Sequence, residues 1–250
     1  MWAVRGRPIA PLPASLVTSM RTALVTGANR GIGLEFITQL ADAGWQVQAC
    51  CRAPAAADAL QALAAAHPAR IRVQALDVED AAQIAALPAQ LSALGHLDLL
   101  INNAGVLVSG ERYGNVRSAD LARSFAINAT APLLITQALT PLLQRGHAAC
   151  VLCLTSQLGS ITQAREFRTV SYAMSKAALN MGVRRLAAEL GPQGISVAAA
   201  HPGWVRTDMG GAQAPLTPQV AVRGLLALAA RLTPAQGGHF YAYDGSELPW

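Results

Sequence analysis

The sequence predicts an α/β fold, in which a single domain is built on a doubly wound parallel sheet of about seven strands with helices on both faces. From Thr22 onward, short runs of β-branched or apolar residues alternate with longer Ala/Leu-rich segments of helical spacing. No linker, shift in composition or repeat divides the chain. Because alternating strands and helices are joined by crossover connections, we expect a mostly parallel sheet.

The runs predicted as strands are 22–26, 46–51, 71–75, 97–102, 149–155, 195–200 and 239–243, with helices between them. Gly44 is expected to end the first helix and Gly146 the long segment 119–145, since glycine is favoured just after helices. The run 53–66 is rich in alanine, but its leucines are spaced to fit one face of a helix.

Composition indicates a folded chain. Its 250 residues are 52% hydrophobic and 13% charged, which excludes a disordered protein. The net charge is +5, but the arginines are scattered and form no basic tract, so we expect no nucleic-acid partner. No uninterrupted apolar run reaches the roughly 18 residues needed to cross a bilayer, so we expect no membrane span.

We expect residues 1–19 to be a disordered leader and residues 20–250 to form the domain. The first nineteen residues are rich in proline, contain two arginines and no acid, and show no periodicity. Met20 directly precedes the first strand and would be a natural start. An organelle or export signal is the alternative, but the apolar segment of an export signal is absent.

The four cysteines are predicted to be buried thiols. Cys50, Cys51, Cys150 and Cys153 all lie in expected strands. Residues three apart on a strand point to opposite faces, so the C-x-x-C pair suits neither a metal nor a dithiol. We therefore expect no metal site and a reducing, cytoplasmic location.

A glycine-rich loop follows the first strand. The strand TALVT leads directly into GANRGIG at 27–33, and a helical pattern follows. Glycines permit a tight turn and a close approach to a pyrophosphate, while the helix N-terminus offers free N–H groups to the phosphates. The spacing G-x-x-x-G-x-G differs from the G-x-G-x-x-G fingerprint, and an ordinary strand-to-helix turn is the alternative.

Two arginines favour NADP(H) over NAD(H). A site that prefers NAD places Asp or Glu at the end of the second strand, where it binds the ribose 2′-hydroxyl. This chain has Cys51 and Arg52 in that region, and Arg30 lies in the glycine loop. Arginine binds phosphate through two parallel hydrogen bonds, so the pair predicts a 2′-phosphate, although each alone is also typical of a solvated surface.

Tyr172 and Lys176 are predicted to form a proton-transfer pair. They lie four residues apart in a helical segment and therefore share a face. A nearby ammonium stabilises a phenolate and lowers its pKa from about 10, so Tyr172 can act as an acid or a base. Lys176 is the only lysine. One lysine placed at random would follow one of the four tyrosines by four residues about once in sixty trials.

Three further motifs border the same region. The sequence NNAG at 102–105 closes the fourth strand, where asparagines suit a turn beside a cofactor. Asn128 interrupts a helical pattern, with Pro132 four residues later, and a polar side chain there holds a bend or belongs to a proton path. Ser156 follows the fifth strand.

Taken together, TGANRGIG, NNAG, Asn128, Ser156, YAMSK and HPG resemble the short-chain dehydrogenase/reductase family, in order and across nearly all of 21–250. The stretch HPGWVRTDMGGAQAPL and the ending GGHFYAYDGSELPW resemble the branch that contains carbonyl reductases of the Sniffer type and C-factor. The resemblance implies a Rossmann-like fold and NADPH-dependent reduction of a small-molecule ketone, aldehyde or quinone. The alternative is a C-factor-like signalling protein that binds NAD(P) with little turnover. An NAD-linked alcohol dehydrogenase is disfavoured by Arg52.

The resemblance also assigns roles to residues. The catalytic tetrad would be Asn128, Ser156, Tyr172 and Lys176. Ser156 would bind the carbonyl oxygen, Tyr172 would deliver the proton, Lys176 would tune Tyr172 and hold the ribose, and Asn128 would position a water. The gap from Ser156 to Tyr172 is a few residues longer than is commonest in the family, which affects the edge of the pocket.

The cofactor contacts that the resemblance and the motifs imply are Gly27, Asn29, Arg30, Gly31, Ile32, Gly33, Arg52, Asp77, Val78, Asn103, Ala104, Gly105, Tyr172, Lys176, Pro202, Gly203, Val205 and Thr207. Among them, Asp77 and Val78 would contact the adenine, and Thr207 the nicotinamide side. NADP(H) is the preferred cofactor, with NAD(H) as the alternative.

Substrate contacts are expected at the carboxyl ends of the strands. The candidates are Tyr113, Ile161, Phe167, Trp204 and Met209, each equally compatible with packing. The segment 204–217, with Gly210 and Gly211 as a hinge, would close over an apolar carbonyl compound. By analogy with the family, a homodimer or homotetramer would form through the helices at 119–145 and 171–191.

Overall fold

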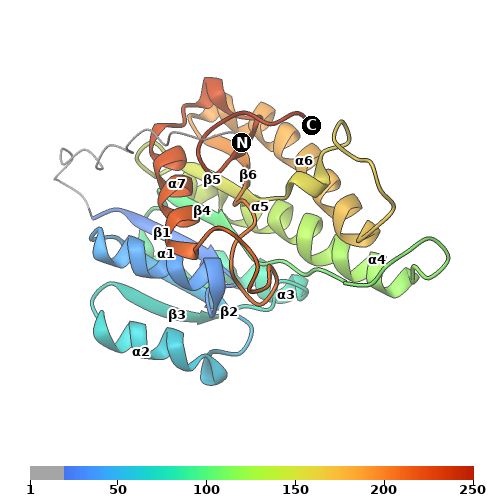
Figure 1. The fold of residues 1–250 in the computed structure, drawn as a ribbon. Coiled ribbons are helices and arrows are strands. Elements are labelled where there is room, and N and C mark those ends of the chain that lie inside the picture. Colours follow the sequence, from blue (N-terminus) through green and yellow to red (C-terminus); the bar gives the residue numbers. More distant parts are fainter. Residues whose placement is uncertain (1–19) are drawn as a thin grey trace.

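The computed structural model describes residues 20–250 and contains one seven-stranded sheet, in which every strand pairs with its neighbours in parallel (Figure 1). The strand order is β3-β2-β1-β4-β5-β6-β7. The doubly wound α/β fold predicted from the sequence is confirmed. The expected leader, 1–19, lies outside the described residues.

The strands are Thr22–Thr26 (β1), Gln46–Cys51 (β2), Ile71–Ala75 (β3), Leu99–Asn102 (β4), Cys150–Leu154 (β5), Ser196–His201 (β6) and Phe240–Ala242 (β7). The α-helices are Gly31–Asp42 (α1), Asp58–Ala66 (α2), Ala81–Gln90 (α3), Ser118–Phe125 (α4), Ala131–Leu143 (α5), Val170–Leu190 (α6) and Pro218–Arg231 (α7). A π-helical turn, Ala126–Thr130 (η3), joins α4 to α5. Short 3-10 turns occur at Pro54–Ala56 (η1), Ser92–Leu94 (η2), Gln157–Gly159 (η4), Gly191–Gln193 (η5) and Pro234–Gln236 (η6).

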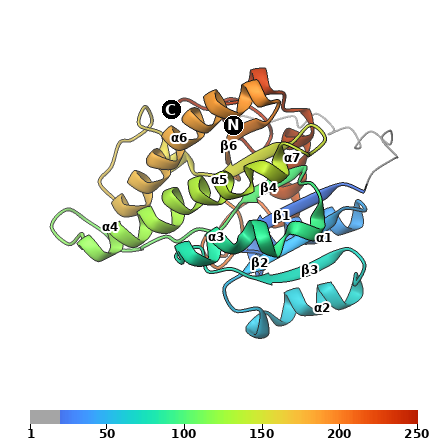
Figure 2. The same ribbon diagram turned by 180° about the vertical axis from the view of Figure 1, so that it is seen from behind.

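Helices cover both faces of the sheet. Helices α1, α2 and α7 pack on one face, where Phe36, Leu60 and Leu225 are fully buried (Figure 1). Helices α3, α5 and α6 pack on the other, where Leu87 and Leu139 are fully buried (Figure 2). Because both faces are covered, β1, β4 and β5 are buried along their whole length, and their apolar residues are consecutive rather than alternating.

The cysteines lie as the sequence predicts. Cys50 and Cys153 belong to the core on the α3, α5 and α6 face, while Cys51 and Cys150 belong to the opposite core. All four are buried, free thiols. Burial raises the pKa of Cys50 and Cys150 to about 12, so these thiols are unreactive near neutral pH.

The long predicted helix at 119–145 is broken by the π-helical turn that contains Asn128. Counted as one helix, 118–143 has the length and mean hydropathy to cross a membrane, which the search for uninterrupted apolar runs missed. Half of its most apolar window is buried inside the fold, where α5 packs against α3 and α4 against α6. Within the described residues this is the environment of a core helix.

The sheet has its topological switch point at β1 and β4. The chain proceeds from β1 toward β2 and β3 on one side, and from β4 toward β7 on the other. In such sheets ligands bind in the crevice beyond the carboxyl ends of the two central strands. The glycine loop follows β1 and the NNAG sequence closes β4, so both predicted cofactor motifs lie at this crevice.

Candidate active site

The glycine loop has a backbone that only small residues tolerate. Gly27 and Gly31 have φ angles of +64° and +54°, in the left-handed region that disfavours side chains. At Gly33 an added Cβ would collide with the carbonyl oxygen of Gly27. The turn from β1 into α1 is therefore tight because these three positions lack side chains.

The N-terminus of α1 opens into a cavity. Arg30 occupies the N-cap position and its side chain makes no capping hydrogen bond. The N–H groups at the start of a helix have no helical acceptor and carry the positive end of its dipole. Gly31, Ile32 and Gly33 line the cavity, so their end of the helix suits a phosphate.

Asn103 and Thr26 hold the glycine loop against the end of β4. The Asn103 amide nitrogen donates to the carbonyl oxygens of Thr26 at 2.8 Å and Gly27 at 3.0 Å. In return, the Thr26 hydroxyl oxygen accepts hydrogen bonds from the backbone N–H groups of Asn103 and Ala104, both at 3.0 Å. Asn103 thus lines the cavity and also fixes the loop beside it.

The cavity has a volume of about 850 Å³ and is lined by nearly all the residues expected to contact a cofactor. The exceptions are Gly203 and Val205, which line only a second, adjoining cavity. Asp77 is positioned by a local turn in which its carboxylate accepts from the Glu79 N–H at 3.0 Å. The cavity is thus continuous from the loop after β3 to Tyr172 and Lys176 at its inner end.

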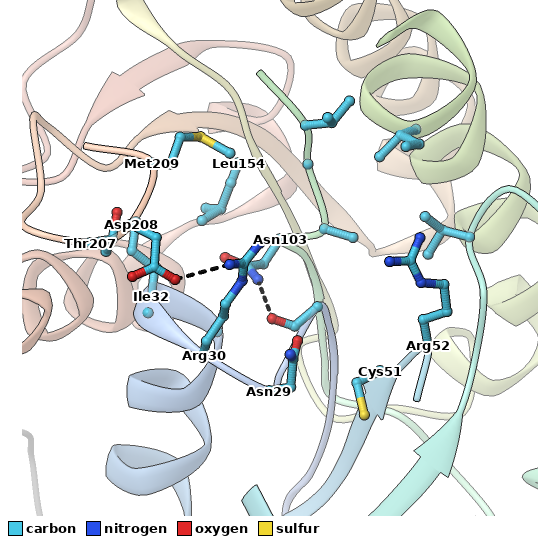
Figure 3. A pocket seen from close by; sticks show the side chains of 18 of the residues that line it. Asn29, Arg30, Ile32, Cys51, Arg52, Asn103, Leu154, Thr207, Asp208 and Met209 are labelled. Atoms are coloured by element: carbon cyan, nitrogen blue, oxygen red, sulfur yellow. Dashed lines mark hydrogen bonds and ion pairs between the residues drawn. The ribbon is translucent and has the colours of Figure 1, made fainter. Parts of the chain in front are cut away.

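Arg30 and Arg52 line opposite sides of the cavity (Figure 3). The guanidinium of Arg30 pairs with Asp208, with 2.9 Å between Nη1 and Oδ2, so the two arginines do not converge here. Sequence reasoning missed Asp208, and it also missed two further lining arginines, Arg123 and Arg206. No local motif indicates them, since they reach the cavity from α4 and from the loop after β6.

Lys176 lies at the inner end of the cavity. Its side chain is buried, and the ammonium donates a hydrogen bond of 2.7 Å to the Leu154 carbonyl oxygen. Burial lowers the pKa of Lys176 to about 8. Gly159 permits this packing, because an added Cβ there would lie 2.8 Å from the Lys176 Cβ.

Tyr172 lies beside Lys176, as the helical spacing predicts, and the ammonium is 5.7 Å from the centre of the phenol ring. The pKa shift differs from the prediction. Burial raises the pKa of Tyr172, and the side-chain interaction with Ser156 only partly offsets that rise. The ammonium is turned toward Leu154 rather than toward the phenol oxygen, so desolvation has the larger effect.

Ser156 is the hydroxyl that faces Tyr172. It lies at the end of β5 and lines the second cavity, which has a volume of about 580 Å³ and to which Tyr172 also contributes. The neighbouring hydroxyls serve the structure instead. Thr155 donates to Asn180 at 2.7 Å, and Ser160 donates to the Pro249 carbonyl oxygen at 2.8 Å.

Asn128 lines neither cavity, and its side chain instead connects two elements that border the site. Its amide oxygen accepts from the Val106 N–H at 2.9 Å, and its amide nitrogen donates to the Val106 carbonyl and the Ser175 hydroxyl, both at 2.9 Å. The side chain therefore joins the loop after β4 to α6. The amide of Asn128 is thus bound by protein groups at the position where a water was expected.

Glu111 is a site-supporting residue that sequence reasoning missed. Its buried carboxylate accepts from the Ser171 N–H at 3.0 Å and from the Ser171 hydroxyl. A carboxylate at a helix N-terminus satisfies free N–H groups and interacts favourably with the helix dipole. Glu111 therefore fixes the first turn of α6, which carries Tyr172.

The second cavity contains two of the five expected substrate contacts, Trp204 and Met209. Tyr113, Ile161 and Phe167 do not line it. Tyr113 and Phe167 form an exposed edge-to-face pair with ring centres 5.4 Å apart.

His201 also lines the second cavity, although the sequence suggested only a family motif there. Burial lowers the pKa of His201 to about 4, so the ring is neutral at pH 7, and its Nδ1 has no partner among the described residues.

The segment after β6 is stabilised by hydrogen bonds between its own residues. The Trp204 indole N–H donates to the Gly210 carbonyl at 2.7 Å, and the Gly210 N–H donates to the Thr207 hydroxyl at 3.1 Å. An added Cβ at Gly210 would collide with the Val205 carbonyl, whereas Gly211 has a φ of +78° and open space around it. Of the two expected hinge glycines, Gly210 is thus packed, whereas Gly211 has open space beside it but donates its backbone N–H to the Thr207 carbonyl oxygen at 2.8 Å.

Comparisons with known proteins agree with this geometry. The chain is 45% identical to C-signal from Myxococcus xanthus over 156 residues, which cover 62% of this chain and 94% of that protein. Its fold matches the carbonyl reductase Sniffer of D. melanogaster with a TM-score of 0.88 and 31% identity, covering 93% of this chain and all of that one. It matches the NADPH-bound carbonyl reductase from chicken fatty liver with a TM-score of 0.86, 35% identity and the same coverage.

Residues 21–215 match the short chain dehydrogenase family, so most of the chain, including the glycine loop, Tyr172 and Lys176, lies within the match. This protein is therefore a member of the short-chain dehydrogenase/reductase family of oxidoreductases and has the Rossmann-like fold of that family.

Proposed function

We propose that this protein is an NADPH-dependent reductase that converts a carbonyl compound, a ketone, aldehyde or quinone, to the alcohol. The observation that carries the proposal is the position of Tyr172, which lines both cavities beside Ser156 and Lys176. A proton donor at the junction of a dinucleotide cavity and a second cavity is the arrangement that carbonyl reduction requires.

The first cavity fits a dinucleotide phosphate. The free helix N-terminus of α1 and the close-packed glycines suit the pyrophosphate. Arg52 reaches the cavity from the end of β2, where no acid is present to favour NAD. The NADPH bound to the chicken carbonyl reductase supports the same preference for this chain. NADPH, when bound, supplies the hydride for the carbonyl carbon.

The chain's own residues supply the proton and bind the oxygen. Ser156 and Tyr172 both reach the second cavity, where their hydroxyls would donate hydrogen bonds to the carbonyl oxygen as it gains charge. The raised pKa of Tyr172 keeps the phenol protonated at neutral pH, which is the form that reduction needs. Lys176, mainly protonated below its pKa of about 8, would stabilise the phenolate left after proton transfer.

The tetrad as a whole remains part of the proposal. Asn128 would act through the position of α6 and through the backbone of η3, since its side chain is bound to Val106 and Ser175. Lys176 would also hold the ribose hydroxyls, since it lines the first cavity. The substrate would lie in the second cavity against Trp204 and Met209.

A second candidate function is signalling, in which cofactor binding matters more than turnover. The 45% identity to C-signal favours it. The buried pair of Tyr172 and Lys176 distinguishes the two functions. A reductase needs Tyr172 as its proton donor, whereas a protein that only binds the cofactor does not.

We also propose that the protein assembles as a homodimer or homotetramer in a reducing, cytoplasmic environment. Helix α6 exposes Met174 and Met181, which are seven residues apart and share a face, and α5 exposes Leu133. Apolar side chains of this kind on two long helices suit a helix-to-helix contact between copies. The four free thiols suit a reducing environment.

To test the proposed function, the rates at which the protein oxidises NADPH and NADH are measured by absorbance in the presence of a panel of quinones, aldehydes and ketones. We expect turnover of at least one carbonyl class, with NADPH preferred. Tight binding of NADPH without turnover of any compound would favour signalling, and a preference for NADH would contradict the roles of Arg30 and Arg52.

A further inference from the structure

Three polar side chains gather at the edge of the sheet opposite the cofactor. His96 and Asp98 directly precede β4, and His147 lies in the loop that leads from α5 into β5. The cofactor cavity begins at Asn103, beyond the other end of β4. At about 3.3 Å per residue, the strand separates Asp98 from Asn103 by roughly 16 Å. The cluster is therefore separate from the reductase site.

The ligand atoms of these side chains converge. One ring nitrogen of each histidine and one carboxylate oxygen of Asp98 lie within 4.8 Å of one another. The His96 Nε2 is 3.3 Å from Asp98 Oδ2, and the His147 Nδ1 is 3.5 Å from Asp98 Oδ1. In a tetrahedral zinc site with bonds of about 2.0–2.2 Å, two ligand atoms lie about 3.3–3.5 Å apart. Each histidine nitrogen thus lies at a ligand-to-ligand distance from one of the two Asp98 oxygens, and small side-chain movements would bring the three ligand atoms around one ion.

The His96 nitrogen is a buried atom in need of a partner. Its contact with Asp98 lacks the alignment of a hydrogen bond, so Nε2 is unsatisfied among the described residues. A buried polar nitrogen without a partner costs about 1–3 kcal/mol, and such groups are uncommon in native structures. A bound cation would satisfy this nitrogen by accepting its lone pair.

Asp98 is fixed as a metal-binding carboxylate would be. It is buried, and its oxygens accept hydrogen bonds from the Thr22 N–H at 2.8 Å and from the His147 N–H at 2.6 Å. Hydrogen bonds of this kind orient a ligating carboxylate and leave it further lone pairs. The neighbouring cation, Arg145, is directed to the Gly95 carbonyl instead, at 2.7 Å.

The loop that carries His147 is pressed against β4. An added Cβ at Gly146 would collide with the Leu97 carbonyl, and Ala148 has a φ of +51°, which is unfavourable for a side chain. These features bring the His147 backbone onto Asp98. Its side chain is 67% exposed, so the imidazole can turn toward an ion entering from solvent, with water completing the coordination.

We propose that His96, Asp98 and His147 bind one divalent transition-metal ion of the zinc class. Two imidazoles and a carboxylate suit zinc, cobalt or nickel, whereas magnesium and calcium require oxygen ligands. The ion would join the 144–149 loop to the start of β4 and stabilise the fold at this edge. The sequence predicted no metal site, because the two histidines are 51 positions apart and form no short motif.

The test is a calorimetric titration of Zn²⁺ into the metal-free full chain, prepared without a polyhistidine tag, together with absorbance of the Co²⁺ form. The variants are His96→Gln and His147→Gln, of which the second changes an exposed side chain that no packing requires. The matched control is His239→Gln, whose ring nitrogen lies 2.7 Å from Glu247 but is not grouped with a third ligand in the described chain.

We expect one Zn²⁺ per chain, at least a tenfold loss of affinity in both cluster variants, and unchanged affinity in His239→Gln. Zn²⁺ should raise the melting temperature of the wild type and the control but not of His147→Gln. Reductase turnover should be the same in His147→Gln as in the wild type. Wild-type binding no tighter than that of His147→Gln, or a thiolate band in the Co²⁺ spectrum that assigns the ion to the cysteines, would overturn the proposal.

Discussion

Arg30 of the glycine loop and Asp208 of the segment after β6 form an ion pair of 2.9 Å across 178 positions of the chain (Figure 3). Both side chains are more than 70% exposed, so the pair contributes little to stability. The pair lies at the cofactor cavity, so it would also affect cofactor binding. A 2′-phosphate and the Asp208 carboxylate would compete for the same guanidinium.

Replacing Asp208 with Asn should therefore tighten NADPH binding. The neutral amide releases Arg30 for the phosphate, and we expect the Kd for NADPH to fall several-fold while the Kd for NADH changes less. Fluorescence titration with both cofactors measures the two values. Equal tightening for NADH and NADPH would show that Asp208 acts only through general repulsion of anions.

We expect the same pair to link cofactor binding to the 204–217 segment. Since this segment lines both cavities through Thr207 and Met209, limited proteolysis of it should change when NADPH and a substrate are added. Proteolysis that is unaffected by both ligands would contradict closure of this segment over the substrate.

Arg52 should determine the preference for NADPH. Loss of charge-assisted hydrogen bonds worth about 1.5–3 kcal/mol predicts that Arg52→Ala raises the Kd for NADPH about 10- to 100-fold and leaves NADH nearly unchanged. Arg123→Ala is the matched control, because Arg123 lines the same cavity but its guanidinium is 3.4 Å from the Glu79 carboxylate. A similar loss in both variants would argue against a specific phosphate contact at Arg52.

Lys176 should not be replaceable by arginine, even though 18 of the 19 basic residues are arginines. The buried space beside Gly159 fits a narrow side chain, so the broader guanidinium should cost about 1–3 kcal/mol of stability. We expect Lys176→Arg to fold but to lose at least 100-fold in kcat/KM. Lys176→Met, which keeps a narrow chain without a charge, should be equally inactive but less destabilised. Near wild-type turnover of Lys176→Arg would contradict the role of the compact ammonium.

The reductase should lose activity at alkaline pH. Because the pKa of Lys176 is lowered to about 8, the ammonium is present below that pH and is lost as the pH rises through it. The pKa of Tyr172 is raised, so the phenol stays protonated over the same interval. We expect kcat/KM, which reports the pKa values of the free enzyme, to fall above about pH 8. A profile that stays flat up to pH 10 would separate Lys176 from catalysis.

Much of the fold follows from local pattern. The β-branched and apolar runs predict β1 to β3 residue for residue, because these strands are bounded by clear turns. The start of β4 is different, since the predicted strand begins at 97 and the observed one at Leu99. The Leu97 N–H donates to the Leu142 carbonyl oxygen of α5, so a long-range contact replaces strand pairing there. The backbone of Asp98 still bonds to Thr22 and Cys150 of the neighbouring strands, so the sheet contacts begin one residue before the assigned strand.

The site divides in the same way. Motifs in contiguous sequence locate the glycine loop and the Tyr172–Lys176 pair, because helix and turn geometry is local. Asp208 and Glu111 were missed, since their partners lie 178 and 60 positions away. The raised pKa of Tyr172 was also missed, because it depends on burial, which spacing along a helix does not report.

The most direct test of the central claim is the turnover of Tyr172→Phe with NADPH and a carbonyl substrate that the wild type reduces. The substitution removes one hydroxyl from a buried ring and should leave the fold and NADPH binding nearly unchanged. We expect kcat to fall by at least 1,000-fold, on the order of the contribution of a positioned general acid. Turnover close to that of the wild type, with NADPH bound equally well, would contradict the assignment of Tyr172 as the proton donor.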